Sequence, residues 1–253
     1  VSNPSAPKLL WKHTNADTGF AELGQTWSEL KVGRIRGQTD PVVIFGLGYD
    51  SVANDTSVTP APSTMGRGVM VLNAVTGAKI WSTEDASGAN RNGTNEYAIA
   101  AGVAPVDTNF DGYVDRIIAA DTGGNIWRIN VDYTDATTNP NNSTSSWTVD
   151  KVASLGATSG ENARKFLGTP DVVVASTSGI PVPYDSILSG SGDREQPFDT
   201  DITNRFYMLK DEHLKTFRYT TALTEADLYD TTSNLIQQGT TAEKTAAQVA
   251  MNN

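Results

Sequence analysis

The side chains whose types and spacing suit metal chemistry lie in one short stretch, DTNFDGYVD, at positions 107 to 115. Oxygen-bearing side chains occupy positions 1, 3, 5 and 9 of the stretch, and a glycine at position 6 permits a sharp turn. Calcium is a hard ion that takes six to eight oxygen ligands, and alternate side chains of such a loop point at one centre. The pattern predicts a calcium loop whose ligands are Asp107, Asn109, Asp111, Asp115 and the backbone carbonyl of Tyr113.

The loop departs from the usual helix–loop–helix calcium site at its end. Position 12, where that site carries a bidentate Glu, is Ile118 and falls in a predicted strand. Asp115 is therefore expected to close the site, and Val114 to point into the core and anchor the loop. Magnesium is disfavoured because it requires a smaller octahedral geometry and keeps its waters. A metal-free hairpin turn is the alternative, since Asn, Asp and Gly also favour turns.

The composition argues against several other classes of function. Lys and Arg total 19 against 29 Asp and Glu, a formal net charge of −10, which disfavours a nucleic-acid partner. There is no cysteine, so disulfides and thiolate metal sites are excluded. The first residues, Val1–Lys8, do not read as a signal peptide. We expect either a cytosolic protein or a mature or excised piece of a longer one, and the strand pattern favours the piece.

Short strands separated by Gly, Asn, Asp, Thr and Pro predict an all-β fold with a weak internal repeat. Three sets of four strands are predicted: Trp27–Ile35, Val42–Gly46, Val69–Asn73 and Ala78–Ser82; Ile99–Val106, Arg116–Asp121, Asn125–Val131 and Trp147–Ala153; Asp171–Ser176, Asp185–Gly190, Arg205–Lys210 and Leu214–Thr220. Four antiparallel strands per unit is the layout of a propeller blade. The prediction is a modified β-propeller with blades over residues 26–84, 99–154 and 171–220, and a β-sandwich is the alternative.

The repeat is incomplete at the start of the chain. Lys8–Lys12 resembles the predicted fourth strand Ala78–Ser82, which implies a preceding blade. Three blades do not close a ring, because propellers have about four to eight. Residues 1–253 are therefore expected to form a single incomplete propeller domain.

Two further kinds of segment interrupt the strand pattern. Capping-box patterns at Thr224–Asp227 and Thr240–Glu243 predict that residues 223–253 are a helical insertion. The loops at 50–66 and 132–146 are long and polar, which suits either binding or disorder.

Side chains that could carry catalysis or ligand binding are sparse. His13 and His213 are far apart in sequence, are predicted at the surface, and have no motif that would make them part of a catalytic triad. The turn Asp193-Arg194-Glu195 predicts a structural ion pair, with a charged ligand as the alternative.

The tryptophans are predicted to pack between blades. Trp11, Trp81 and Trp127 recur beside apolar strand positions, where a large aromatic side chain fills the core. Trp147 lies beside a long loop, so stacking on a sugar is its alternative role.

Taken with its neighbours, the acidic loop resembles the PilC/PilY-type tip-associated adhesins of type IV pili. The stretches that carry this resemblance are Phe20–Ser28, Pro41–Asp50, Gly68–Trp81, Asp107–Asn130 and Gly190–Pro197. Leu47 departs from the pattern at a position where a glycine is expected. The family's other blades and its N-terminal portion, usually a von Willebrand-type domain, are not found in this chain.

The resemblance implies a modified propeller at the C-terminal end of a larger surface protein, and it implies the same five calcium ligands. It further implies a virulence-associated role in pilus biogenesis, in calcium-dependent control of extension and retraction, and in attachment to host cells or surfaces. The expected partners are the minor pilins of the pilus tip complex and a host-cell or surface receptor. The expected location is the cell surface, at the pilus tip or outer membrane. No enzyme activity is expected.

An enzyme alternative rests on Gly68–Trp81, which is similar to the blade signature of quinone-dependent dehydrogenases. In those propellers the Trp and Gly residues pack blade against blade, which is a scaffold role rather than catalysis. Many such enzymes also place a cysteine pair beside the quinone cofactor, and this chain has no cysteine.

Overall fold

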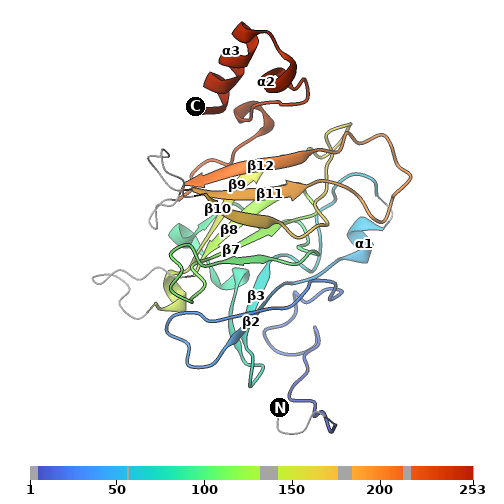
Figure 1. Ribbon diagram of the computed structural model, residues 1–253. Helices are drawn as coiled ribbons and strands as arrows, with labels where there is room; N and C mark the ends of the chain where they lie inside the picture. Colours follow the sequence, from blue (N-terminus) through green and yellow to red (C-terminus); the bar gives the residue numbers. More distant parts are fainter. Residues whose placement is uncertain (1–4, 56, 132–141, 176–183, 213–217, 253) are drawn as a thin grey trace.

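The computed structural model describes residues 5–55, 57–131, 142–175, 184–212 and 218–252. This part of the chain is mainly β, with three sheets stacked one above the other and a short helical segment at the C-terminal end (Figure 1). No helix within it has the length and apolar character needed to cross a membrane.

The strand order is β1-β2-β3-β4 in the first sheet, β5-β9-β8-β7-β6 in the second and β10-β11-β12 in the third. The strands are β1 (Lys31–Gly33), β2 (Val42–Gly46), β3 (Val69–Asn73), β4 (Lys79–Ser82), β5 (Arg91–Asn92), β6 (Ala104–Val106), β7 (Arg116–Ala120), β8 (Asn125–Asn130), β9 (Thr148–Ser154), β10 (Asp171–Ala175), β11 (Tyr184–Gly190) and β12 (Phe206–Glu212). The helices are α1 (Ser51–Asn54), α2 (Leu235–Gln238) and α3 (Thr241–Asn252), and 3-10 turns lie at Thr83–Asp85, Gly88–Asn90, Thr144–Ser146 and Glu225–Asp227.

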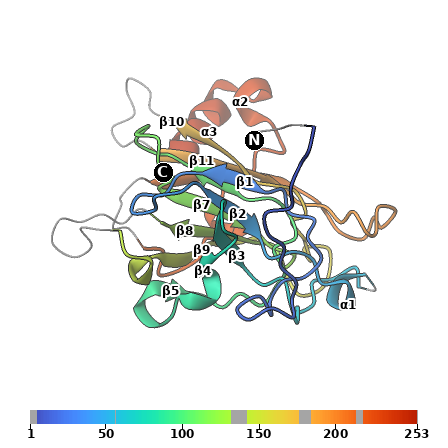
Figure 2. The same ribbon diagram turned by 90° about the horizontal axis from the view of Figure 1, so that it is seen from below.

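The second sheet is the middle layer. Its strands β7 (RIIAA) and β8 (NIWRIN) are buried over their whole length. A strand that faces water on one side alternates apolar and polar residues, whereas a nearly continuous apolar run suits burial on both faces. In the view from below, the first sheet lies in front of the second (Figure 2).

Two apolar layers hold the three sheets together. The layer between the first and second sheets contains Ile44, Val71, Trp81, Ile117 and Trp127 among its buried side chains. The layer between the second and third sheets contains Ile118, Ile126, Val152, Ile187 and Leu209. Because β7 supplies Ile117 to one layer and Ile118 to the other, adjacent residues of one strand hold both neighbours in place.

The third sheet buries only one of its faces completely. Along β12, Tyr207, Leu209 and Asp211 are buried, whereas Phe206 and Met208 are 71% and 48% exposed. This alternation is the period of two expected for a strand with one wet face.

The predicted central strands are confirmed, and the predicted first strands are too long. β2 and β3 have the predicted bounds, but Lys31–Gly33 replaces Trp27–Ile35 and Ala104–Val106 replaces Ile99–Val106. The amide of Ile99 donates to the carbonyl of Gly66, so residues 99–103 run past the end of the first sheet instead of joining the second.

The rest of the predicted third set falls partly outside the described residues. The predicted strand Leu214–Thr220 includes residues 213–217, which are not described, and the described residues 218–220 are not in a strand. The β-sandwich alternative is wrong, because the described strands form three separate sheets rather than two. β5, which pairs in parallel with β9, was not predicted.

The expected strand at Lys8–Lys12 is wrong. The backbone there pairs with no strand, and the side chain of Trp11 lies instead over the β3–β4 turn, where its Nε1 donates to the carbonyl of Ala74 at 3.1 Å. Gly77 in this turn has a φ of +73°, and a Cβ on it would lie 2.6 Å from the Trp11 ring. The bare glycine therefore lets the indole cover the turn.

His13, predicted at the surface, is half-buried beside Trp11. Its ring stacks on Phe20 at 4.0 Å between centroids, and its Nε2 lies 2.9 Å from the carbonyl oxygen of Gly77. His213 lies outside the described residues.

Two of the three tryptophans predicted to pack between blades lie in the layer between the first two sheets, whereas Trp11 packs against a different cluster. Trp81 and Trp127 are buried there, as predicted, together with Trp147. The rings of Trp81 and Trp147 lie 5.3 Å apart between centroids. The sugar-stacking alternative for Trp147 is wrong, because that side chain is 1% exposed and lies within the core.

The loop at 50–66 is organised by one buried carboxylate. Asp50 Oδ1 accepts from the amides of Val52 and Ala53 at the start of α1, and its Oδ2 accepts from the amide and hydroxyl of Thr64. Burial raises the pKa of Asp50, but these hydrogen bonds outweigh burial and lower the pKa below its usual value. Most of the other long loop, residues 132–141, lies outside the described residues.

The helical segment begins where its capping patterns predict. The amide of Thr240 donates to Glu243 Oε2 at 2.8 Å, and the amide of Glu243 donates back to Thr240 Oγ1 at 3.4 Å. This reciprocal pair satisfies two amides at the start of α3, which have no partner within the helix.

Candidate functional site

The predicted calcium loop connects β6 to β7 and is anchored at its C-terminal end. The amide of Asp115 donates to the carbonyl of Val106 at 2.8 Å, and the amide of Val114 donates to the carbonyl of Arg34 at 2.8 Å. The side chain of Val114 is buried between the first two sheets, as predicted. The loop is therefore fixed both to its own sheet and to the connection that follows β1.

The first half of the loop is wrapped around its own amides. Asp107 Oδ1 and Asn109 Oδ1 both accept from the amide of Asp111, at 3.2 and 3.0 Å. Asp107 Oδ2 accepts from the amide of Gly112 at 2.8 Å, and Gly112 has a φ of +88°. The predicted sharp turn is confirmed, and it places the oxygens of loop positions 1 and 3 around one amide.

Asp115 closes the loop from the other side. Its Oδ2 accepts from the amide of Thr108 at 2.8 Å and from the hydroxyl of Thr108 at 2.6 Å. Asp115 is 4% exposed, the most buried of the predicted acidic ligands. Both bonds go to the same oxygen, so Thr108 fixes the orientation of the Asp115 carboxylate.

A cation from the connection between β1 and β2 already lies against the loop. The guanidinium of Arg36 forms a hydrogen-bonded ion pair with Asp111 Oδ2, and its Cζ lies 4.7 Å from the centroid of the Tyr113 ring. Arg36 thereby contacts loop positions 5 and 7, two of the predicted ligand positions. Asp111 Oδ1 is turned the other way, toward the amide of Tyr113 at 3.0 Å.

The donor set suits a hard cation, but the loop is not closed around one centre. Among the described residues, no three acidic or histidine side chains converge as a metal site. Asp107 and Asn109 lie together, whereas Asp111 is turned to Arg36 and Asp115 to Thr108. All five predicted donors are oxygens, and Arg36 is a stand-in cation at one of them, so the residues fit calcium in chemistry and in sign of charge.

A second charged cluster, which sequence reasoning missed, is buried between the second and third sheets. Arg128 Nη1 lies 2.5 Å from Asp211 Oδ1, and Arg116 Nη1 lies 3.1 Å from Asp185 Oδ2 and 3.4 Å from Asp211 Oδ2. Arg128 Nη2 is 3.9 Å from Asp150 Oδ2.

Residues outside the strands complete this cluster. Arg218 makes bidentate contacts with Asp150 at 2.7 and 2.8 Å, and Tyr219 donates its hydroxyl to Asp211 Oδ1 at 2.7 Å. Burial, followed by the nearby charge of Asp211, raises the pKa of Tyr219 above its usual value. Among the described residues of the cluster, three arginines face three aspartates, so their formal charges balance. The signal in the sequence was an arginine inside each of two apolar strands, β7 and β8.

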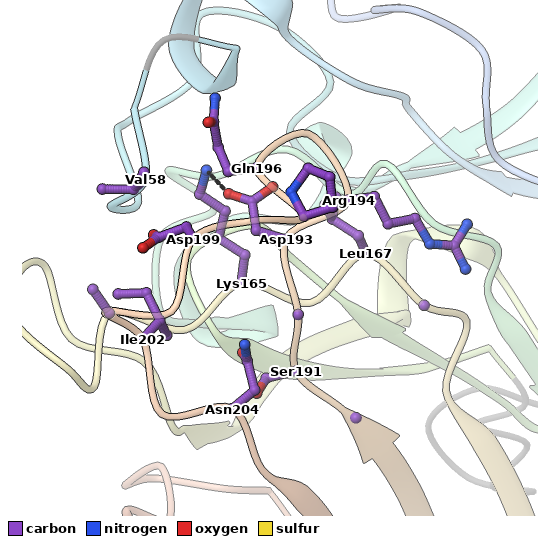
Figure 3. Close-up of a pocket in the computed structure, with 15 residues that line it drawn as sticks. Val58, Lys165, Leu167, Ser191, Asp193, Arg194, Gln196, Asp199, Ile202 and Asn204 are labelled. Atoms are coloured by element: carbon purple, nitrogen blue, oxygen red, sulfur yellow. Dashed lines mark hydrogen bonds and ion pairs between the residues drawn. The ribbon is translucent and has the colours of Figure 1, made fainter.

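A cavity of about 450 Å³ lies between the 50–66 loop and the segments 163–168 and 190–204. Lys165 and Asp193 form part of its wall, and the Lys165 Nζ lies 2.7 Å from Asp193 Oδ2 and 2.6 Å from the carbonyl oxygen of Ser57 (Figure 3). Arg194 points away from this pair in the close-up. Asp193 of the predicted turn does form an ion pair, but its partner is Lys165, which lies outside the turn.

Glu195, which lies beside this pair, holds its proton more tightly than an ordinary carboxylic acid does. Burial, followed by a hydrogen bond and charge repulsion from Asp193, raises the pKa of Glu195 to about 7. Burial also raises the pKa of Tyr49 nearby, with the hydrogen bond to Asp55 as the next cause. These groups link the 50–66 loop to the 193–195 turn.

Comparison of the fold with solved structures finds the crystal structure of the PilY1 C-terminal domain from Pseudomonas aeruginosa, with a TM-score of 0.61 and 21% sequence identity. The match covers 89% of this chain and 45% of that one, so the matched part spans less than half the length of the solved chain. No protein-family model matches the sequence, and no curated protein matches it. At this identity the likeness shows the fold, and at that level it confirms the resemblance inferred from the sequence.

Proposed function

We propose that this chain is a calcium-binding, non-catalytic part of a β-propeller at the tip of a type IV pilus. It would act there in pilus biogenesis, in calcium-dependent extension and retraction, and in attachment to a surface or host cell. The observation that carries the proposal is the likeness of fold to the PilY1 C-terminal domain over 89% of the chain, together with the loop at 107–115. Minor pilins and a surface receptor are the proposed partners.

The arrangement of the sheets supports the propeller. In each sheet the consecutive long strands pair antiparallel in chain order, as in a blade. The first strands β1, β6 and β10 are neighbours, with β6 in contact with both of the others. First strands that lie side by side are what blades around a common axis require. We therefore propose that residues 1–253 form one propeller domain with three of its blades.

The calcium proposal assigns Asp107, Asn109, Asp111, Asp115 and the carbonyl of Tyr113 as the residues that would hold the ion. A bound calcium ion would offset the negative charge of the loop and tie β6 to β7. The residues themselves already supply the anchors for this, since Asp115 and Val114 fix the loop to β6 and to the connection after β1.

Among the described residues, the position of Trp147 does not support the sugar-binding alternative. The side chain proposed for sugar stacking, Trp147, is buried. A reconstitution assay with pyrroloquinoline quinone and a dye acceptor tests the dehydrogenase alternative, for which turnover is the positive result.

Calcium binding is tested by titration calorimetry and by thermal unfolding in calcium or EDTA. At a calcium concentration of 100 times the dissociation constant, binding should stabilise the native state by about 2.7 kcal/mol. Asp111→Ala should remove that gain and leave unfolding in EDTA nearly unchanged. Asp201→Ala, an exposed aspartate outside the loop, is the matched control and should keep the gain. No heat of binding to the wild-type chain would reject the calcium site.

The pilus role is tested in the bacterium that carries the gene. Deletion should reduce surface pili and twitching motility, and the wild-type gene should restore both. A gene with Asp111→Ala should restore less motility than one with Asp201→Ala. Full piliation and motility in the deletion strain would contradict the proposed role, whatever the result of the calcium titration.

A further inference from the structure

The connection between β1 and β2 is built against the proposed calcium loop. Ile35 is fully buried between the first two sheets, and the backbone on either side of it is bonded to the second sheet's loops. The carbonyl of Arg34 accepts from the amide of Val114, and the carbonyl of Arg36 accepts from the Nδ2 of Asn142 at 2.9 Å. The backbone of residues 34–36 is therefore held in a fixed position beside the loop.

This position directs the Arg36 side chain onto the loop. Its guanidinium pairs with Asp111 Oδ2 and lies over the ring of Tyr113. The ion pair joins residues 75 positions apart in sequence. The side chains of Arg36 and Asp111 are 40% and 32% exposed, so solvent cations have access to the pair.

We propose that Arg36 is a tethered counter-cation that competes with calcium for Asp111 and thereby sets the affinity of the loop. The inference rests on the proposed calcium site. A metal ion that takes Asp111 as a ligand must displace the guanidinium from Oδ2 or lie close to its positive charge. Either case weakens binding, because two cations held a few ångströms apart repel.

The competition also defines which cations the loop favours. A divalent ion that replaces the guanidinium increases the charge that faces the carboxylates, whereas a monovalent ion only replaces one positive charge with another. Because Arg36 lies in the connection between two strands of the first sheet and Asp111 in a loop of the second, its displacement would also remove one contact between the loops of the two sheets. Calcium occupancy would then be sensed at their junction.

The test is calcium titration of the whole chain by calorimetry at low ionic strength, with three variants. Arg36→Gln should bind calcium about three- to tenfold more tightly than the wild type, since it removes the competing charge. Arg36→Lys keeps the charge but loses the planar fork, and should lie between the two. Arg34→Gln is the matched control: it removes the same charge from an exposed side chain two residues away, and should change the affinity less than twofold.

The outcomes distinguish failure of the role of Arg36 from failure of the calcium site. An affinity of Arg36→Gln equal to that of Arg34→Gln, or weaker than that of the wild type, would overturn the role of Arg36 while leaving the calcium site in place. Absence of binding to the wild type and to all variants would overturn the site itself. Unfolding curves in EDTA verify that the variants are folded, because loss of an exposed ion pair costs little stability.

Discussion

Two clusters of arginine and aspartate join the second sheet to its neighbours, and they differ in burial. Arg36 and Asp111 link it to the first sheet at a site open to solvent. Arg128, Arg116 and Asp211 link it to the third sheet with side chains 0 to 4% exposed. The same two residue types thus form a solvent-accessible ion pair in one place and a buried network in the other.

The difference follows from the balance of charge in each place. The buried cluster pairs each of its carboxylates with guanidinium groups, as it must, because an uncompensated charge in the interior is very costly. At the loop, solvent reaches the carboxylates of Asp107 and Asp111, and Arg36 pairs with Asp111. An excess of negative charge is tolerable there because water screens it, and the excess favours a divalent cation.

The largest expected effect comes from the buried cluster. Asp211→Asn should lower the free energy of unfolding by about 3–5 kcal/mol, because it leaves buried arginines without full compensation. The same change at the exposed cluster, Asp111→Asn, should cost less than about 1 kcal/mol in EDTA. Urea unfolding of both variants measures the contrast, and equal losses would contradict the difference in burial on which it depends.

A double variant tests whether the buried ion pair adds net stability or only offsets the cost of burying each charge. In Arg128→Met combined with Asp211→Leu, both charges of the closest pair are removed. The double variant should be more stable than Asp211→Asn alone by about 1–3 kcal/mol, since apolar replacements of similar volume are often tolerated where single removals are not. Urea unfolding at matched protein concentration is the measurement. A strictly additive loss would show that the pair is not coupled.

In the half-buried turn at 193–195, replacement of Glu195 should have an intermediate effect on stability, and that effect should depend on pH. The pKa of Glu195 is raised to about 7 from an ordinary value of 4.5, so the folded state holds this proton more tightly than the unfolded state. The stability of the wild type relative to Glu195→Gln should therefore fall as pH rises from about 4.5 to 7. Thermal unfolding of both proteins across this range tests the sign. A difference that is constant with pH would show that Glu195 does not titrate there.

The smallest effect is expected at the exposed pair itself. Arg36→Gln should change the free energy of unfolding in EDTA by less than about 1 kcal/mol, and 1 M NaCl should remove most of that change. Arg218→Gln, which disturbs the buried Asp150, should lose more stability and should respond less to salt. A salt response of similar size in the two variants would contradict the expectation that salt screens the exposed ion pair more strongly than the buried one.

Local sequence patterns determined the strands with strong periodicity, the turn at Gly112, the capping box before α3 and the inward position of Val114, because short-range sterics and burial decide these features. The same patterns marked the five oxygen donors of the loop, although their convergence on calcium stays a prediction. The strand predictions were wrong at Lys8–Lys12 and at residues 99–103, where the chain does not join a sheet.

Only the tertiary structure decided which charges meet. Arg36 contacts Asp111 across 75 positions, and Arg116 contacts Asp211 across 95. Trp147, beside a loop in sequence, is in the core because the second sheet packs on the first. Such pairings depend on how whole sheets stack, and stacking is set by the combined burial of many apolar side chains rather than by any local motif.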